Sequence, residues 1–327
     1  MSPQVVYCIT GASGFVGRHL INRLGKESKI VVRALTRDPL EARRRLGILH
    51  TSTELFKGDL EDIQSLWDFP VAGSTVIHLG FLAHASSRQN LEAAYHLVET
   101  CRKARVAKFI HVSTAVVTGT TFVPLVTEDT PCQPSSEYEQ TKLAIEDLIL
   151  RSLGPICPVT VLRPTCIYGE FGKNLLKLTL SQKRESVWKA LLKNVILKNR
   201  QLNLVYVGNV VEAILHLSCS SPERETRGTF LISEDEIEEN SYGPVVERLR
   251  RALELPLLPR FPAAIPASAL PVIFGLLGKG RFSPMRRYSA GRLLASGFQF
   301  PFSLDKGLLR FTHWYLNNED PKHQYFT

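Results

Sequence analysis

Tyr138 and Lys142 are the residues of this 327-residue chain whose types and spacing could do chemistry together. Positions four apart lie on one face of a helix, so a phenol and an ammonium group there can act on one bound molecule. A nearby ammonium group stabilises a phenolate and lowers the phenol pKa from its usual value of about 10. Tyr138 would then exchange a proton with an alcohol or carbonyl oxygen near neutral pH. By itself, the spacing more often marks a solvated helix surface.

Three glycines near the start of the chain predict a phosphate-binding loop between a strand and a helix. An apolar run at residues 5–9 is typical of a buried strand, and helix-spaced apolar residues follow the loop. Gly11 permits a tight turn, Gly14 lets backbone N–H groups approach a pyrophosphate, and Gly17 lets the helix pack closely. The anion would lie at the helix N-terminus. The candidate cofactor-binding residues of this loop are Gly11, Ser13, Gly14, Phe15, Val16 and Gly17.

The end of the next apolar run, residues 30–35, indicates which dinucleotide binds. A dinucleotide-binding fold usually carries an acid for the cofactor ribose there. Thr36 stands near that place instead, and Arg37 follows. A cation without a carboxylate suits a 2′-phosphate, so the sequence favours NADP over NAD. Asp38 precedes a proline, a pair that usually starts a turn, and we expect no ribose contact from it.

Strands and helices alternate throughout the first half of the chain. Apolar runs at residues 75–80 and 108–113 are typical of strands, and a helix-spaced stretch lies between them. This alternation predicts an α/β fold with a doubly wound parallel sheet, in which ligands bind at the carboxyl ends of the strands. The residues expected at such ends include Gly11, Asp59, Gly80 and Thr114.

The order and spacing of these motifs resemble the extended short-chain dehydrogenase/reductase family, also called the NAD-dependent epimerase/dehydratase family. The resemblance covers nearly the whole chain and implies a Rossmann-type domain with a smaller C-terminal substrate-binding part. The implied cofactor domain takes residues 1–165 and regains about 203–233, while the substrate part takes 166–202 and 234–327. The segments that carry the resemblance are 10–17, 58–60, 76–79, 113–114, Tyr138 with Lys142, 162–169 and 205–210.

The same resemblance implies roles for individual residues. Tyr138 would be the acid/base, Lys142 would lower its pKa and bind the nicotinamide ribose, and Thr114 would polarise the reacting oxygen. Ser113 is the neighbouring candidate for that oxygen. The other implied cofactor contacts are Arg37 at the 2′-phosphate, Asp59 and Leu60 at the adenine, Gly80 and Phe81 along the cofactor, and Arg163 and Pro164 at the nicotinamide end. The family often forms homodimers through the helix that carries Tyr138, although a core role explains the apolar residues of that helix as well.

The second half most resembles nucleotide-sugar 4-epimerases and 4-keto-reductases. Residues 167–178 look like their substrate entry segment, which would place Asn174 at the nucleotide diphosphate, with Arg200 and Arg287 as further contacts. Leu202, however, stands where many of these enzymes carry an arginine. Diphosphate recognition would then rest on Arg200.

The resemblance therefore implies an NADP(H)-dependent oxidoreductase or epimerase of a sugar nucleotide. Use of NADP favours net reduction of a keto group over epimerisation, because family members that return the hydride to the substrate within one turnover tend to keep NAD. Residues 206–210 also resemble the hydroxysteroid dehydrogenase branch, so an apolar alcohol or ketone is the alternative substrate. A scaffold protein without chemistry is a third alternative, but such proteins commonly lose the tyrosine or the lysine.

Composition narrows the classes of ligand. Hydrophobic residues make up 44% of the chain, and 40 Lys and Arg against 31 Asp and Glu give a formal charge of +9. This field favours anionic small molecules, and the spread of the basic residues along the chain argues against nucleic acid. Six cysteines and nine histidines show no metal-ligand spacing, so we expect no metal.

The cysteines stand mostly in apolar runs, which is typical of reduced thiols in a cytoplasmic protein. We expect no signal peptide, because the apolar run at residues 5–9 is too short for one. Residues 261–278 contain no charged residue. Three prolines in that segment argue against a straight membrane-spanning helix. We expect the segment to cover the substrate pocket, with contact at a membrane surface as the alternative.

Overall fold

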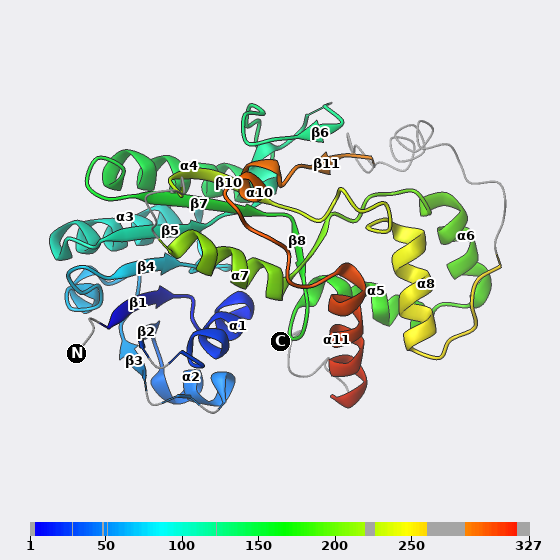
Figure 1. Ribbon diagram of the computed structural model, residues 1–327, viewed down its shortest axis with the longest axis horizontal. Helices are drawn as coiled ribbons and strands as arrows, with labels where there is room; N and C mark the ends of the chain where they lie inside the picture. The colour runs from blue at the N-terminus through cyan, green and yellow to red at the C-terminus, as the bar shows by residue number, and fades with distance from the viewer. Residues whose placement is uncertain are drawn as a thin grey trace.

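A seven-stranded parallel sheet forms the centre of the computed structural model (Figure 1). Its strand order is β10-β7-β5-β4-β1-β2-β3, so the chain crosses from one side of β1 to the other between β3 and β4. In open α/β sheets, ligands bind beside such a reversal, at the carboxyl ends of the strands. The strands are β1 (Val5–Thr10), β2 (Ile30–Thr36), β3 (Thr53–Lys57), β4 (Thr75–His78), β5 (Lys108–Val112), β7 (Val159–Pro164) and β10 (Gly228–Ile232). The structure describes residues 4–27, 29–47, 49–50, 52–121, 123–219, 226–259 and 285–318.

Helices cover both faces of the sheet, which confirms the predicted doubly wound α/β fold. One hydrophobic cluster joins one face to α1, α2 and α7, and a second joins the opposite face to α3 and α4. A parallel sheet needs this cover because its apolar strands are buried on both sides. These helices are α1 (Phe15–Leu24), α2 (Pro39–Leu46), α3 (Ser87–Ala104), α4 (Glu137–Leu153) and α7 (Val207–Ser218).

A capping box fixes where α4 begins, and so which way its side chains point. The Ser136 side chain accepts a hydrogen bond from the backbone N–H of Glu139, and the Glu139 carboxylate accepts one from the backbone N–H of Ser136. Such reciprocal bonds satisfy N–H groups that a helix start leaves without partners. At the same end, the Thr141 hydroxyl donates to Ser87 at the start of α3 over 2.6 Å. The first two turns of α4 are therefore held firmly against α3.

Several elements of the second half form a smaller, mainly helical part beyond the carboxyl ends of the strands, on the right of Figure 1. Its core contains Tyr168, Tyr206, Phe311 and Trp314, and Leu202 packs against this cluster. Its elements are α5 (Lys173–Arg184), α6 (Val187–Leu197), α8 (Tyr242–Ala252), α11 (Leu304–Asn317) and the strand pair β8 (Cys166–Tyr168) with β9 (Leu204–Tyr206). The short α10 (Gly291–Ala295) and the strand pair β6 (Leu125–Val126) with β11 (Arg287–Tyr288) pack beside β10 instead.

Residues 203–233, which we expect to belong to the cofactor domain, form β9, α7 and β10. β10 joins the edge of the central sheet and α7 packs on its face, whereas β9 pairs with β8 outside that sheet. The division of the chain into two interleaved parts stays a prediction. The uncharged segment 261–278 lies outside the described residues. Among the residues that are described, no helix combines the length and the apolar character that a membrane span needs.

Candidate functional site

A pocket of about 360 Å³ lies at the carboxyl ends of the strands, beside the reversal in strand order. Eight of the residues expected to bind a cofactor line it, although they come from loops after four different strands. Side chains that the sequence did not indicate, among them Leu79 and Leu82, also line it. The expected residues in the lining are Gly11, Ser13, Gly14, Arg37, Asp59, Leu60, Gly80 and Phe81.

The glycines of the loop permit contacts that side chains would block. Gly11 has a φ of +67°, and a Cβ there would lie 2.8 Å from the backbone nitrogen of Gly80. A Cβ on Gly17 would lie 2.3 Å from the carbonyl oxygen of Gly11, so the helix could not approach the loop. α1 begins after Gly14 with no side-chain cap and no acidic residue in its first turn. Its free N–H groups and positive dipole end suit a pyrophosphate, so this loop fits a dinucleotide.

Two arginines line this pocket, and among the described residues Arg37 is the one without a carboxylate partner. The Asp38 side chain caps α2 and accepts hydrogen bonds from the backbone N–H groups of Leu40 and Glu41, at 2.9 and 3.1 Å. This matches the expectation that Asp38 starts a turn. Arg45 also lines the pocket, but its Nε lies 2.8 Å from the Glu41 carboxylate. Arg37 is exposed and makes no hydrogen bond or ion pair within the described ranges.

Lys142 is buried under the end of this pocket, with only 4% of its surface exposed. Its Nζ donates to the carbonyl oxygen of Val112 over 3.1 Å and lies 5.5 Å from the centre of the Phe81 ring. Burial lowers the pKa of the Lys142 ammonium group to about 8, while the charge of Glu146 acts to raise it. Lys142 is therefore a cation that loses its proton in the range where many enzymes work.

Tyr138 is 46% exposed, and the edge of its ring packs on Phe81 at a centroid distance of 5.2 Å. Within the described part of the chain its hydroxyl has no hydrogen bond to Lys142, and partial burial raises its pKa. The lowering of the Tyr138 pKa by Lys142 thus stays a prediction. Phe81 touches both side chains and also lines the pocket, so the three features belong to one site.

Ser113 and Thr114 follow β5 at the same end of the sheet. The Thr114 side chain caps the 3-10 helix Ala115–Thr118 and accepts from the backbone N–H of Val116 at 3.4 Å. A hydroxyl that accepts one bond keeps its own proton to donate. The Ser113 Oγ is buried and has no partner among the described residues. Ser113 therefore stays, with Thr114, a candidate for a hydrogen bond to the reacting oxygen.

Arg163 and Pro164, expected at the nicotinamide end, do not line the pocket. Arg163 is buried, and its guanidinium group pairs with the Glu146 carboxylate through bonds of 2.6, 3.1 and 3.2 Å. Pro164 is the buried last residue of β7. Phe15, Val16 and Gly17 lie behind the pocket, in the first turn of α1. Sequence reasoning missed Glu146, although it stands four positions after Lys142.

Three of the four residues expected to bind substrate, namely Asn174, Arg200 and Arg287, do not line the pocket. Asn174, near the start of α5, is exposed and donates from Nδ2 to the carbonyl oxygen of Ile167 over 2.8 Å. Arg200 lies near Cys166, and its pKa is lowered by burial. Arg287 lies in β11, where its charge acts on the carboxyl group of Asp235. None of the three lines the larger cavity described next either.

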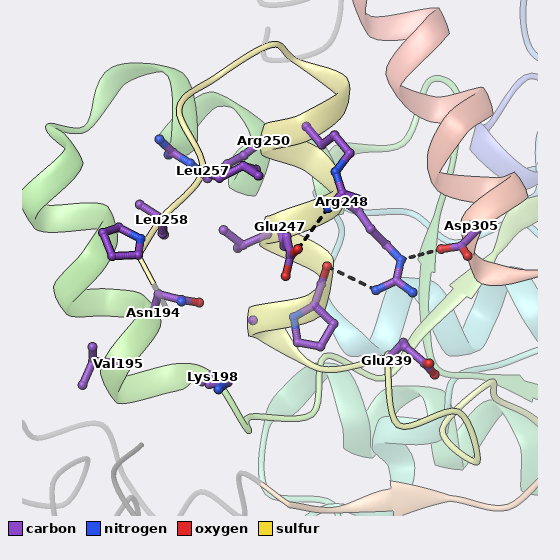
Figure 2. A pocket seen from close by; sticks show the side chains of 15 residues that line it. Asn194, Val195, Lys198, Glu239, Glu247, Arg248, Arg250, Leu257, Leu258 and Asp305 are labelled. Atoms are coloured by element: carbon purple, nitrogen blue, oxygen red, sulfur yellow. Dashed lines mark hydrogen bonds and ion pairs between the residues drawn. The ribbon is translucent and has the colours of Figure 1, made fainter. Parts of the chain in front are cut away.

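A larger cavity of about 790 Å³ lies between α6, α8 and the residues that follow α8 (Figure 2). It contains none of the expected site residues. Its arginines already have partners, since Arg248 pairs with Asp305 and Arg251 pairs with Glu247. We therefore do not assign the chemistry to this cavity.

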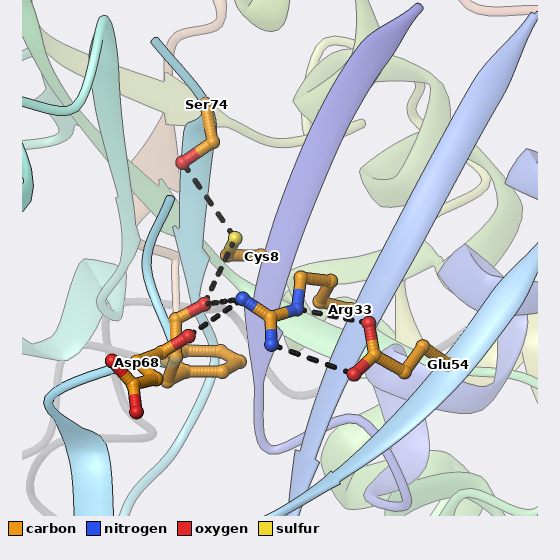
Figure 3. A network of polar contacts seen from close by, with 6 residues as sticks. Cys8, Arg33, Glu54, Asp68 and Ser74 are labelled. Carbon is orange, nitrogen blue, oxygen red and sulfur yellow. Dashed lines mark hydrogen bonds and ion pairs between the residues drawn. The ribbon is translucent and has the colours of Figure 1, made fainter. Parts of the chain in front are cut away.

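Arg33 on β2 holds neighbouring strands and the loop before β4 together (Figure 3). Its guanidinium group contacts the Glu54 carboxylate on β3 at 3.0 Å and donates to the carbonyl oxygens of Asp68 and Phe69 at 2.6 and 3.0 Å. Cys8 on β1 contacts Phe69 as well. These bonds tie β1, β2 and β3 to the loop before β4. Local sequence patterns could not predict these bonds, because the partners are distant in the chain.

Comparisons with known proteins agree with this geometry. A family model described as the NAD dependent epimerase/dehydratase family matches residues 7–232. The 4-hydroxy-2-methyl-3-oxo-4-farnesyl-3,4-dihydroquinoline-1-oxide ketoreductase of Stigmatella aurantiaca is 30% identical over 170 residues, which cover 49% of this chain and 50% of that protein. The decarboxylating sterol-4-alpha-carboxylate 3-dehydrogenase of Mus musculus is 28% identical over 225 residues, covering 64% and 59%. The chain thus matches only about half of the length of these two relatives.

Solved structures match over almost the whole chain. The UDP-glucuronic acid 4-epimerase from Bacillus cereus in complex with NAD has a TM-score of 0.67 at 19% identity, covering 95% of this chain and 98% of that one. The NAD complex of UDP-glucose 4-epimerase from Thermus thermophilus has a TM-score of 0.69 at 18% identity, covering 96% and 100%. At such identities the likeness shows the fold.

Proposed function

We propose, from the premise that this chain belongs to the NAD-dependent epimerase/dehydratase family, that it is an NADP(H)-dependent reductase or epimerase of a sugar nucleotide. Membership confirms the resemblance found in the sequence and makes the chain an NAD(P)-dependent oxidoreductase or epimerase. The choice of NADP, the residue roles and the substrate are proposals.

One observation supports the reaction type above all others: Phe81 lines the dinucleotide pocket and also contacts Tyr138 and Lys142. A bound dinucleotide would supply hydride transfer at its nicotinamide. Tyr138 presents an accessible phenol that can give a proton to the substrate oxygen. Thr114 donates a hydrogen bond to the same oxygen, and Lys142 keeps a positive charge beside it.

Arg37 supports NADP, because it offers a guanidinium group where Asp38 is committed to capping α2. We expect Arg37→Ala to weaken NADPH binding about tenfold or more, the effect of losing a charge-assisted bond to phosphate. NADH binding should stay within about twofold, since NADH has no 2′-phosphate. Titration of nicotinamide fluorescence measures both. Arg43→Ala, an exposed arginine of α2 outside the pocket lining, is the matched control. An equal loss for both cofactors would contradict the assignment.

A sugar nucleotide is favoured by the positive field and by the start of α5. That helix begins after Gly172 with no side-chain cap and carries Lys173 and Asn174 in its first turn, a setting suited to a diphosphate. The chain has a formal charge of +9, which attracts anionic substrates.

An apolar ketone is the second candidate, and Leu202 favours it. This side chain packs into the aromatic cluster of the C-terminal part instead of offering a charge for a diphosphate. In addition, the names of two relatives describe a ketoreductase of a farnesylated quinoline and a sterol dehydrogenase.

A substrate panel separates the two. We expect NADPH oxidation, followed by absorbance, with at least one nucleotide-linked 4-keto sugar and none with a sterol ketone or a prenylated quinolone. An epimerase would instead convert a nucleotide sugar to its epimer without net oxidation of NADPH, which chromatography detects. Turnover of the apolar ketones alone would replace the first candidate with the second.

A further inference from the structure

α4 carries three functional groups along one face, and only two of them belong to the proposed proton transfer. Tyr138, Lys142 and Glu146 follow one another at intervals of four residues, and side chains at such intervals have Cβ atoms about 5–6 Å apart. Glu146 is 1% exposed and lies one turn deeper than Lys142. A buried carboxylate without compensation is costly, so its partner matters.

That partner is Arg163, which reaches Glu146 from β7. The Arg163 Nε lies 3.1 and 3.2 Å from the two carboxylate oxygens, and one terminal nitrogen lies 2.6 Å from Oε2. This geometry is that of a bidentate pair, the strong form of the interaction. β7 is the neighbour of β5 in the sheet, and the last residue of β5, Val112, is the one that Lys142 contacts.

We propose that the Glu146–Arg163 pair sets how firmly Lys142 holds its proton, and thereby the pH range in which Tyr138 transfers one. This inference rests on the proposed function for Tyr138 and Lys142, and it gives Arg163 a positioning role in place of a cofactor contact. The Glu146 carboxylate stabilises the Lys142 ammonium group, whose pKa burial has lowered to about 8. The Arg163 cation cancels part of that stabilisation, because the same carboxylate serves both.

The other titratable groups that face Lys142 keep one charge state over the working range. His78 on β4 and His111 on β5 are fully buried, and burial followed by the Lys142 charge lowers the pKa of His78 to about 3 and that of His111 well below its usual value. The His78 imidazole is therefore neutral above pH 6, and burial acts in the same direction on His111. Burial raises the pKa of the Cys132 thiol, which lies beside Arg163, although the Arg163 charge opposes this. Tyr138 completes the set, and its titration is the one that the pair would influence through Lys142.

Opposite single substitutions test the proposal. Glu146→Gln removes the carboxylate and leaves the Arg163 cation, so Lys142 should lose its proton at a pH about one unit lower. In Arg163→Met the Glu146 carboxylate interacts with Lys142 alone, so Lys142 should lose its proton at a pH about one unit higher. The double variant should return to within about half a unit of the wild type. Arg163→Lys keeps the charge and should stay close to the wild type, a rescue that a purely geometric role would not give.

The first readout needs no substrate. The full-length protein is labelled with carbon-13 at lysine Cε, and the signal of Lys142 is assigned by its loss in Lys142→Met. Its titration is followed between pH 6 and pH 11. Midpoints that move in opposite directions support the proposal, whereas equal midpoints in all variants, or shifts in the same direction, would overturn it.

The second readout is the high-pH limb of kcat/KM with the substrate found in the panel. We expect this limb to move with the Lys142 midpoint in each variant. If no carbonyl compound is turned over, the proposed function fails while the titration still decides the electrostatic coupling. If turnover occurs but the high-pH limb of kcat/KM does not shift with the Lys142 midpoint, the proposed coupling to Tyr138 is wrong although the proposed function stands.

Discussion

Replacing Tyr138 with phenylalanine is expected to lower kcat about a thousandfold, the usual size of a general-acid contribution. The phenol is the accessible proton donor beside the pocket, and phenylalanine keeps the ring that packs on Phe81. NADPH affinity should therefore change by less than about twofold, since only the hydroxyl group is lost. Single-turnover absorbance of NADPH with saturating substrate measures the rate, and fluorescence titration measures the affinity.

Tyr95→Phe is the matched control for this experiment. Tyr95 is a tyrosine on α3 with 49% of its surface exposed, close to the 46% of Tyr138, but it lies outside the pocket lining. It should keep wild-type kcat. A Tyr138→Phe variant with unchanged turnover would refute Tyr138 as the acid/base, and Ser113 or Thr114 would then be tested next.

Replacing Lys142 with methionine is expected to have two opposite effects, which makes it the second decisive variant. kcat/KM should fall about a hundredfold or more, because the positive charge beside the reacting oxygen is lost. At the same time, the unliganded protein should gain about 1–2 kcal/mol of unfolding free energy at pH 7, because an apolar side chain replaces a buried ammonium group. Turnover assays and urea unfolding measure the two effects.

The lowered pKa of Lys142 also predicts how the free energy of unfolding changes with pH. The pKa of Lys142 is about 8 in the folded protein against 10.5 for the ordinary side chain. Between these values the unfolded chain holds a proton that the folded protein has released, so stability should rise with pH across that window. Lys142→Met should lack this rise. Lys177→Met, at an exposed position of α5, should keep it. A variant that is less stable at pH 7 would mean that the bond to Val112 outweighs the cost of burial.

Local patterns were sufficient to predict the elements of the site. The glycine spacing predicts the loop, because Gly11 needs a positive φ and Gly17 must approach a carbonyl oxygen. The Asp-Pro pair indicated a turn at Asp38, and in the structure the Asp38 side chain caps α2. Spacing by four put Tyr138 and Lys142 on one face of α4. All of these depend on backbone geometry over a few residues, which sequence reports directly.

Local patterns could not predict which charged groups lie close enough to interact in the folded protein. The sequence suggested that Lys142 acts directly on Tyr138, but its Nζ is bonded to Val112, thirty positions earlier in the chain. The resemblance placed Arg163 at the nicotinamide, and the structure pairs it with Glu146. Both outcomes follow from the neighbouring positions of β5 and β7 and from α4 packing across them.

The sequence by itself determined the fold class, the glycine loop, the position of Arg37 after β2 and the pairing of a phenol with an ammonium group. Only the tertiary structure decided that Phe81 joins the pocket to that pair, and that Glu146 and Arg163 stand behind it. The physical reason is the separation along the chain of the residues that interact. Turn and helix geometry act between residues close in the chain, whereas burial and charge depend on which strands the sheet brings together.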